Sequence, residues 1–349
     1  MKKTLPIIFI ALLIALLSFA TQGASFTNND LEGLEFEDGP RVRDLPHPEW
    51  FKLSFLNLRE DLAEAVHAGK QGLIIYYGQK HCAYCTALIR NNFGRKDIED
   101  YTNRHFDVVA IDIWGDREVT DINGRVLSEK AMAVMEKATF TPSLVFYDQE
   151  GREALRLPGY YPPYQFLAAL EYVADGHYRQ ESFRDYLARA DPPLAFEPDG
   201  LNQNDFFGSP PYYLDRRHFP NARPLVVFFE QGKCHACDIL HTGPLHDSQV
   251  LQILDGFDAV QLDITAETPL ITPDGKRTTA RRWASELGLF YAPSLLFFAS
   301  DGQEIIRIDS VIQIYRLNAV LNYVASGDYR QEPNFQRWRE DYTQRILAR

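Results

Sequence analysis

"LIIYYGQKHCAYC" (73–85) joins a run of apolar residues directly to a Cys-x-x-C pair, and the pattern returns as "LVVFFEQGKCHAC" (225–237). The chain has 349 residues and four cysteines, and all four lie in these two pairs. A short apolar run predicts a buried strand, and we expect the cysteine pair to open a helix. Each copy therefore predicts a strand, a reactive cysteine pair and a helix in direct succession.

Three further blocks repeat in the same order, which indicates two copies of one domain. The cysteine blocks are 152 residues apart, and the other blocks are 151 apart. They pair "FDVVAIDI" (106–113) with "FDAVQLDI" (257–264), "TPSLVFYDQEGRE" (141–153) with "APSLLFFASDGQE" (292–304), and "EYVADGHYRQE" (171–181) with "NYVASGDYRQE" (322–332). We expect one domain at 45–190, a linker at 191–224 and a second domain at 225–345.

Helical and apolar segments alternate within the first copy, which predicts an α/β domain with a mixed sheet. The expected elements are a helix at 57–69 with Asn57 as N-cap, a strand at 73–77, a helix from the cysteine pair to about 92, a strand at 107–113, a hairpin turning at Asn123-Gly124, a helix at 127–138, strands at 143–147 and 153–157, and a last helix at 163–174. The second copy repeats this order, with its hairpin turning at Asp274-Gly275. It lacks the leading helix or keeps a short one near 213–218.

The first residues predict export. Two lysines precede an almost wholly apolar run from Leu5 to Ala20, and small residues follow it. This is the pattern of a cleavable signal peptide, which we place at 1–24, and the expected location is the periplasm. The formal net charge of −12 repels phosphate backbones, so we expect no nucleic acid partner.

The cysteine spacing favours redox chemistry. Each pair closes a loop of only four residues, which constrains an unfolded chain very little, so a purely structural disulfide is the weaker interpretation. Zinc ribbons place two such pairs about 15–20 residues apart, far closer than these, so we expect no metal. Covalent haem needs a histidine directly after the second cysteine, and Thr86 and Asp238 stand there. We expect no cofactor.

A cysteine at the start of a helix is poised for disulfide exchange. Unpaired backbone N–H groups and the positive end of the helix dipole stabilise a thiolate on Cys82 or Cys234. A thiolate attacks a disulfide, and Cys85 or Cys237, one turn further on, can resolve the mixed disulfide. All four cysteines are therefore candidate catalytic residues.

A proline precedes a buried strand in each copy, at Thr141-Pro142 and at Ala292-Pro293. Proline in a sheet is normally confined to edges, first positions and bulges. A cis-proline beside the cysteine pair would explain why both copies have one, and an ordinary proline at a strand start is the alternative.

Both copies resemble the thioredoxin superfamily, over nearly all of the chain after residue 24. They are most similar to its periplasmic branch that includes the SoxW-type proteins, on "PEWFKLSFLNLREDLAEA", "YYGQKHCAYC", "TPSLVFYDQEG", "RLPGYYPPYQFLAALEYV" and "YRQESFRDYL". The resemblance implies two tandem thioredoxin-like folds, each a central mixed sheet flanked by helices with an inserted β-hairpin.

The resemblance also implies roles for residues. In the first copy Cys82 attacks, Cys85 resolves, and the cis Thr141-Pro142 bond shapes a peptide-binding groove flanked by Gly159. In the second copy the matching positions are Cys234, Cys237, Ala292 and Pro293. Ser310 stands at the Gly159 position there, so we expect a different groove that serves another partner or a weaker catalyst.

Some positions depart from the family pattern. Thioredoxins place a buried acid six residues before the nucleophile, where this chain has Tyr76 and Phe228. Glu230 is a candidate proton acceptor in the second copy, although we expect it to be a solvated loop residue.

Residues beside the cysteines can tune the thiolates. Tyr84 lies between the first pair, as in the glycine-tyrosine pairs of periplasmic disulfide isomerases. His81 and His235 would each stabilise an adjacent thiolate when protonated, or are surface histidines without coupling. Trp114 and the aromatics at 160–164 would line a protein-binding surface or, as is more usual for such residues, pack in the core.

We therefore expect a periplasmic thiol–disulfide oxidoreductase that acts as a reductase on disulfide-bonded cysteines of exported proteins. The resemblance implies a membrane thiol-transfer protein of the DsbD or CcdA kind as its electron donor. A disulfide isomerase or oxidase is one alternative. Another is a client-binding, chaperone-like protein in which the second domain is not catalytic.

Overall fold

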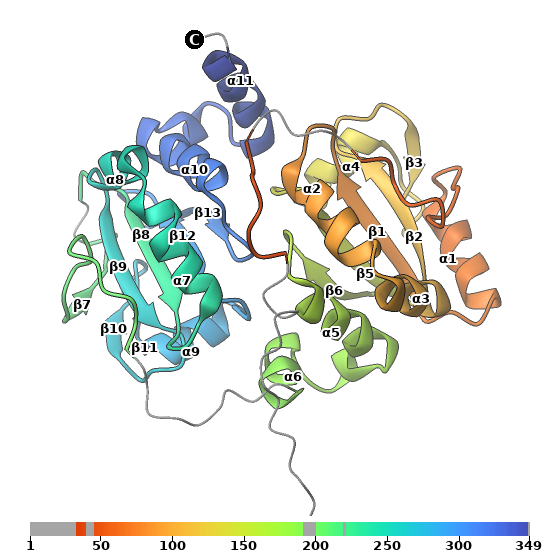
Figure 1. Cartoon of the computed structure of the whole chain (residues 1–349), viewed down its shortest axis with the longest axis horizontal. Helices are drawn as coiled ribbons and strands as arrows, with labels where there is room; N and C mark the ends of the chain where they lie inside the picture. Colours follow the sequence, from red (N-terminus) through yellow and green to blue (C-terminus); the bar gives the residue numbers. More distant parts are fainter. Residues whose placement is uncertain (1–32, 40–44, 191–199, 219–220, 348–349) are drawn as a thin grey trace, which may run out of the picture.

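Figure 1 shows two α/β units side by side, the first coloured orange to light green and the second green to blue. The structure is a computed structural model that describes residues 33–39, 45–190, 200–218 and 221–347. The expected signal peptide lies outside the described residues, as do residues 191–199 of the linker. Within the described part of the chain, no helix has the length and apolar character that a membrane span requires.

The first unit alternates helices and strands in the expected order. Its elements are α1 (Leu58–His67), β1 (Gly72–Gly78), α2 (Ala83–Ala87), a π-helical turn (Leu88–Phe93), α3 (Lys96–His105), β2 (Phe106–Asp112), β3 (Glu118–Thr120), β4 (Val126–Ser128), α4 (Glu129–Met135), β5 (Ser143–Asp148), β6 (Glu153–Leu157), α5 (Pro163–Ala174) and α6 (Phe183–Ala190). The expected N-cap Asn57 and the β3–β4 hairpin are both present.

A four-stranded mixed sheet forms the centre of this unit, in the order β2-β1-β5-β6. Strand β2 runs parallel to β1, whereas β5 and β6 are antiparallel to their neighbours. Every residue of β1 is buried, because helices cover both faces of the sheet. Ile74 packs with α2, α3 and α5 on one face, while Leu73 and Ile75 pack with α1 and α4 on the other. This explains the unbroken apolar run in the sequence.

The second unit repeats the sheet in the order β9-β8-β12-β13. Its elements are β7 (Tyr212–Tyr213), β8 (Leu225–Glu230), α7 (His235–Thr242), α8 (Ser248–Leu254), β9 (Asp258–Asp263), β10 (Pro269–Ile271), β11 (Arg277–Thr279), α9 (Ala280–Glu286), β12 (Ser294–Phe298), β13 (Glu304–Ile308), α10 (Ile314–Ser326) and α11 (Phe335–Leu347). The two units confirm the predicted fold class.

Some expected elements differ from the structure. No helix forms at 213–218 among the described residues; instead β7 pairs in parallel with β10, and Leu214 covers the sheet face that α1 covers in the first unit. Helix α4 is shorter than the predicted 127–138. Each unit also continues past its predicted last helix into a further helix, α6 or α11, whose aromatic residues pack back on the unit.

The two units exchange aromatic residues across their contact. Phe140, two residues before the first proline, is buried in the apolar core of the second unit, where its ring lies 5.3 Å from that of Phe335. Tyr291, at the same position of the second copy, is buried in the core of the first unit, 5.6 Å from Tyr161. The contact is therefore reciprocal, and it involves the loop that precedes the proline in each unit.

The loops that follow β6 and β13 also meet across the contact. The backbone N–H of Val311 donates to the Tyr160 carbonyl at 3.1 Å, and the Tyr161 hydroxyl donates to the Asp309 carbonyl at 2.9 Å. Tyr160 and Tyr161 are fully buried, so these aromatics form part of a packed interface rather than an open surface. Tyr164 alone of them is exposed.

We expect Phe140→Ala to destabilise the docked pair of units. Removing a buried phenylalanine leaves a cavity that costs about 3 kcal/mol or more, and this side chain lies in the core of the opposite unit. Chemical denaturation followed by tryptophan fluorescence measures the loss. Val134→Ala, an exposed position on α4, serves as the control and should change the free energy of unfolding very little. Equal stability of the two variants would contradict the packing described here.

Candidate active site

The first cysteine pair lies where β1 ends and α2 begins. Cys82 is the N-cap of α2, and its sulfur accepts a hydrogen bond from the Cys85 N–H at 3.0 Å. The two sulfurs form a disulfide, with the Cα atoms 5.2 Å apart. His81, the residue before the N-cap, has a positive φ of 53°, a backbone conformation that residues other than glycine adopt uncommonly. This turn aims the Cys82 sulfur at the loop that precedes β5.

The second pair has the same geometry. Cys234 is the N-cap of α7, its sulfur accepts from the Cys237 N–H at 3.1 Å, and the disulfide joins Cα atoms 5.1 Å apart. Lys233 repeats the positive φ of His81, at 55°. The copies therefore share the backbone arrangement as well as the sequence motif.

Both expected cis-prolines are present and lie beside the cysteines. The Thr141-Pro142 and Ala292-Pro293 bonds are cis. The Cys82 sulfur lies 3.6 Å from the Thr141 carbonyl oxygen, and the Cys234 sulfur lies 3.5 Å from the Ala292 carbonyl oxygen. In each copy the first cysteine thus contacts the residue before the proline.

A chain of hydrogen-bond donors ends at the Cys82 sulfur. The Trp114 indole donates to Gln79 Oε1 at 2.7 Å, and Gln79 Nε2 donates to Thr141 Oγ1 at 2.6 Å. The Thr141 hydroxyl lies 3.4 Å from the sulfur, and it must be the donor because a disulfide sulfur carries no hydrogen. Such a donor stabilises a thiolate. Ala292 lacks this hydroxyl, so the second centre has no equivalent.

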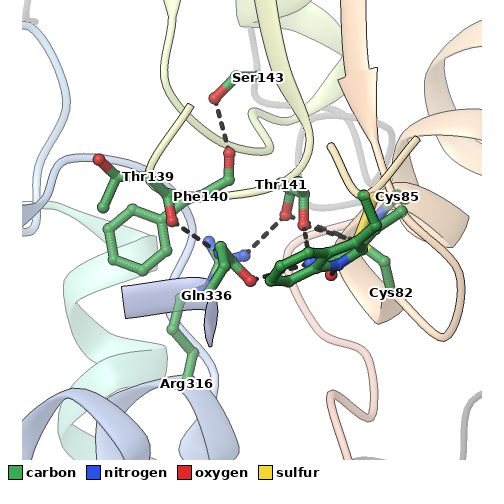
Figure 2. The surroundings of a disulfide bond; sticks show 10 residues. Cys82, Cys85, Thr139, Phe140, Thr141, Ser143, Arg316 and Gln336 are labelled. Carbon is green, nitrogen blue, oxygen red and sulfur yellow. Dashed lines mark hydrogen bonds between the residues drawn. A yellow bond between two sulfur atoms is a disulfide. The ribbon is translucent and has the colours of Figure 1, made fainter. Parts of the chain in front are cut away.

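Figure 2 shows the loop from Thr139 to Thr141 between the disulfide and two side chains of the second unit. Gln336 Nε2 donates to the Thr139 carbonyl at 2.6 Å, and Arg316 Nη2 donates to the Thr141 carbonyl at 3.0 Å. Two backbone carbonyls beside the first cis-proline therefore accept hydrogen bonds from side chains of the second unit of the same chain.

Gly159, expected to flank a groove, contacts the second unit instead. A Cβ atom built on Gly159 would lie 2.1 Å from Ser310 Oγ. The two loop residues that occupy the same position in the two copies thus face each other. The absence of a side chain at Gly159 allows this close approach.

The expected tuning residues have different environments. His81 and His235 are both exposed, whereas Tyr84 is buried. The Tyr84 hydroxyl donates to Asp38 at 2.9 Å and accepts from the Gln313 N–H at 2.9 Å. Burial holds the pKa of Tyr84 well above its usual value, so the phenol stays neutral and acts as a structural link.

Asp38 and Arg316 complete the first centre, and the sequence did not point to either. The Asp38 carboxylate accepts from the N–H groups of Tyr315 and Arg316, at 2.9 and 2.8 Å, at the start of α10. The Arg316 guanidinium carbon lies 3.2 Å from the centroid of the Tyr84 ring. Asp38 lies in a short segment before the first unit, and Arg316 lies in the second, so no local motif connects them with Cys82.

Glu230 is not the solvated loop residue that the sequence suggested. It ends β8, is fully buried, and accepts from His241 Nε2 at 3.0 Å and from Gln261 Nε2 at 3.0 Å. His241 lies one helical turn after Cys237 on α7. A buried carboxylate needs partners of this kind, and the partners come from a helix and a neighbouring strand.

Both first cysteines are covered. Cys82 is 3% exposed and Cys234 is 7% exposed. Among the described residues, no group of three or more His, Cys, Asp or Glu side chains is placed to hold a metal ion. A partner that reacts at Cys82 must therefore first gain access to a buried sulfur.

Comparison with known proteins agrees with this architecture. A family model described as a thioredoxin-like domain matches residues 58–174 and again 219–325, together more than half of the chain. No curated protein matches the chain.

Several solved structures are similar to parts of the chain. A thioredoxin-fold protein from Helicobacter pylori is 29% identical, covering 34% of this chain and 78% of its own, with a TM-score of 0.30. A thioredoxin from Thermus thermophilus is 22% identical, covering 34% and 83%, with a TM-score of 0.28. The oxidised C-terminal domain of DsbD from Neisseria meningitidis is 22% identical, covering 29% and 80%, with a TM-score of 0.24.

The repeated family match, the two Cys-x-x-C disulfides at helix starts and the cis-prolines against their sulfurs converge on one chemistry. That chemistry is thiol–disulfide exchange. The chain belongs to the thioredoxin-like family, with two tandem domains, and is a thiol–disulfide oxidoreductase.

Proposed function

We propose that this protein is a periplasmic reductase that transfers electrons to disulfides of exported proteins. The observation that carries the proposal is the disulfide at Cys82–Cys85, with its first sulfur held against the loop of Thr141 and Pro142. A reduced pair at this position would have one cysteine supported by hydrogen-bond donors and a second cysteine one turn away.

The proposed reaction exchanges electrons between the Cys82–Cys85 pair and one disulfide of the client. The Cys82 thiolate attacks a client disulfide, which breaks the client S–S bond and forms a mixed disulfide. Cys85 then loses its proton and attacks the Cys82 sulfur, which releases the client as a dithiol and leaves the Cys82–Cys85 disulfide. Two electrons pass to the client, and no cofactor takes part.

The proposed domain limits remain 45–190 and 225–345, joined by a linker at 191–224. Periplasmic location is proposed from the leader pattern at residues 1–24. In that compartment the oxidised protein needs a source of electrons, which we propose to be a membrane thiol-transfer protein of the DsbD or CcdA kind. Cys234 and Cys237 share the geometry of the first pair, which favours a second redox centre over a purely client-binding domain.

We expect the Cys82–Cys85 pair to have a reduction potential near that of thioredoxin, roughly −270 mV. Titration against dithiothreitol buffers with thiol trapping, in a variant with Cys234 and Cys237 changed to serine, measures it. A potential of about −120 to −180 mV would instead identify an oxidase or isomerase. Replacing Cys82 and Cys85 by serine should abolish reduction of a model disulfide substrate, whereas unchanged client binding without turnover would identify a chaperone-like protein.

We expect Thr141→Val to lower the potential of the first pair. The change keeps the shape of the side chain but removes the hydroxyl that lies 3.4 Å from the Cys82 sulfur. A hydrogen bond to a charged group contributes about 1.5–3 kcal/mol, so the potential should fall by about 30 mV or more. Thr139→Val, two residues earlier, has its hydroxyl on the Lys137 carbonyl and should leave the potential unchanged. Equal potentials in both variants would show that the hydroxyl has no part in the centre.

A further inference from the structure

Arg316 is a buried cation at the first redox centre, although it belongs to the second domain. It lies in the first turn of α10, is 3% exposed, and covers the ring of Tyr84 between the two cysteines of the first pair. The same position of the first copy is Gln165, and the position of Tyr84 in the second copy is Ala236. The arrangement therefore exists at only one of the two centres.

The guanidinium group is incompletely paired. Nη2 donates to the Thr141 carbonyl, but Nε and Nη1 are buried and have no hydrogen-bond partner in the described part of the chain. Among the described residues, no carboxylate forms an ion pair with Arg316 within 4 Å. A buried cation with two donor nitrogens left unsatisfied is costly, so a negative charge that arises nearby would be stabilised.

The reduced Cys82 sulfur is such a charge. Both the sulfur and Arg316 Nη2 contact the Thr141 carbonyl oxygen, at 3.6 and 3.0 Å, so they lie within about 7 Å of each other. In a buried site such as this one, charges at this separation interact far more strongly than at an exposed surface. The electrostatic effect favours the thiolate over the disulfide.

We propose that Arg316 is a positioning residue of the first redox centre that stabilises the Cys82 thiolate and so couples reduction of the first domain to docking of the second. Reduction breaks the Cys82–Cys85 bond; two glutathione thiols supply two electrons and become glutathione disulfide, leaving a thiolate on Cys82, a thiol on Cys85 and one released proton. The docked arrangement is then more stable with reduced Cys82 than with the disulfide. This inference rests on the proposed function in one respect only: the Cys82–Cys85 pair must take part in thiol–disulfide exchange.

Two other charged groups face Arg316. The Asp38 carboxylate accepts from the Tyr84 hydroxyl and from the Arg316 backbone N–H, and burial raises its pKa. Arg339 of α11 adds a second positive group, whose pKa burial and the charge of Arg316 lower to about 10. The charged groups that face Arg316 are therefore one carboxylate, Asp38, and one further cation, Arg339.

The test compares Arg316→Gln with Arg316→Lys in the full chain, with Cys234 and Cys237 changed to serine so that one pair titrates. We expect Arg316→Gln to shift the equilibrium with glutathione at least tenfold toward the disulfide, which is about 30 mV for a two-electron couple. Alkylation rates against pH should show a raised pKa of the Cys82 thiol. Arg316→Lys should restore most of both quantities, because it keeps the charge.

Arg307→Gln is the matched control. Arg307 is a partly buried arginine of the second domain that pairs with Glu304 on β13, so its loss perturbs that domain without removing the charge near Cys82. It should leave the equilibrium with glutathione within twofold of the unchanged protein. A shift under twofold in Arg316→Gln, or an equal shift in Arg316→Lys, would overturn the proposal. The potential of the unchanged protein tests the reductase function separately, so either idea can fail alone.

Discussion

The loop before each cis-proline is the constraint on which the rest of the structure depends. In the first domain, one side of this loop touches the Cys82 sulfur through Thr141, while Phe140 enters the core of the second domain. Tyr291 does the reverse from the second domain. The same few residues contact both the disulfide and the opposite domain. We therefore expect a change at the disulfide to alter the contact between the domains, and the reverse, so that the two domains form a coupled pair rather than independent copies on a linker.

The copies have diverged where they meet, while their sheets have stayed alike. The first centre has a buried tyrosine, a hydroxyl donor on Thr141 and a cation from the opposite domain. The second centre has alanine at both matching positions, and instead pairs Glu230 of β8 with His241 of α7. A hydrogen bond or a nearby charge alters a thiolate by an energy comparable with the differences between redox proteins. We therefore expect two separated potentials on one chain, which would give electrons a preferred direction between the centres.

Most of the fold could be predicted from the sequence, since repeats, apolar runs and turn residues are local signals. The cysteines, the N-cap Asn57 and the cis-prolines could be predicted for the same reason. Arg316 and Asp38 were not, because their roles depend on contacts between distant segments. Arg316 lies 175 residues from Thr141 and 278 residues from Asp38. Glu230 was misjudged because a glutamate after an apolar run is usually solvated, and its partners, His241 on α7 and Gln261 on β9, are distant in the sequence.

The incompletely paired guanidinium of Arg316 has a consistent explanation once the redox states are compared. In the disulfide state Nε and Nη1 of this buried cation have no hydrogen-bond partner in the described part of the chain, so docking of the second domain is opposed by the cost of desolvation. Reduction creates an anion on Cys82 and offsets that cost. By thermodynamic linkage, if docking stabilises the thiolate by some free energy, then the thiolate stabilises docking by the same amount. If Arg316 couples the two as proposed, a client that takes the electrons leaves behind a protein whose domains are held together less tightly, and whose disulfide is easier for a donor to reach.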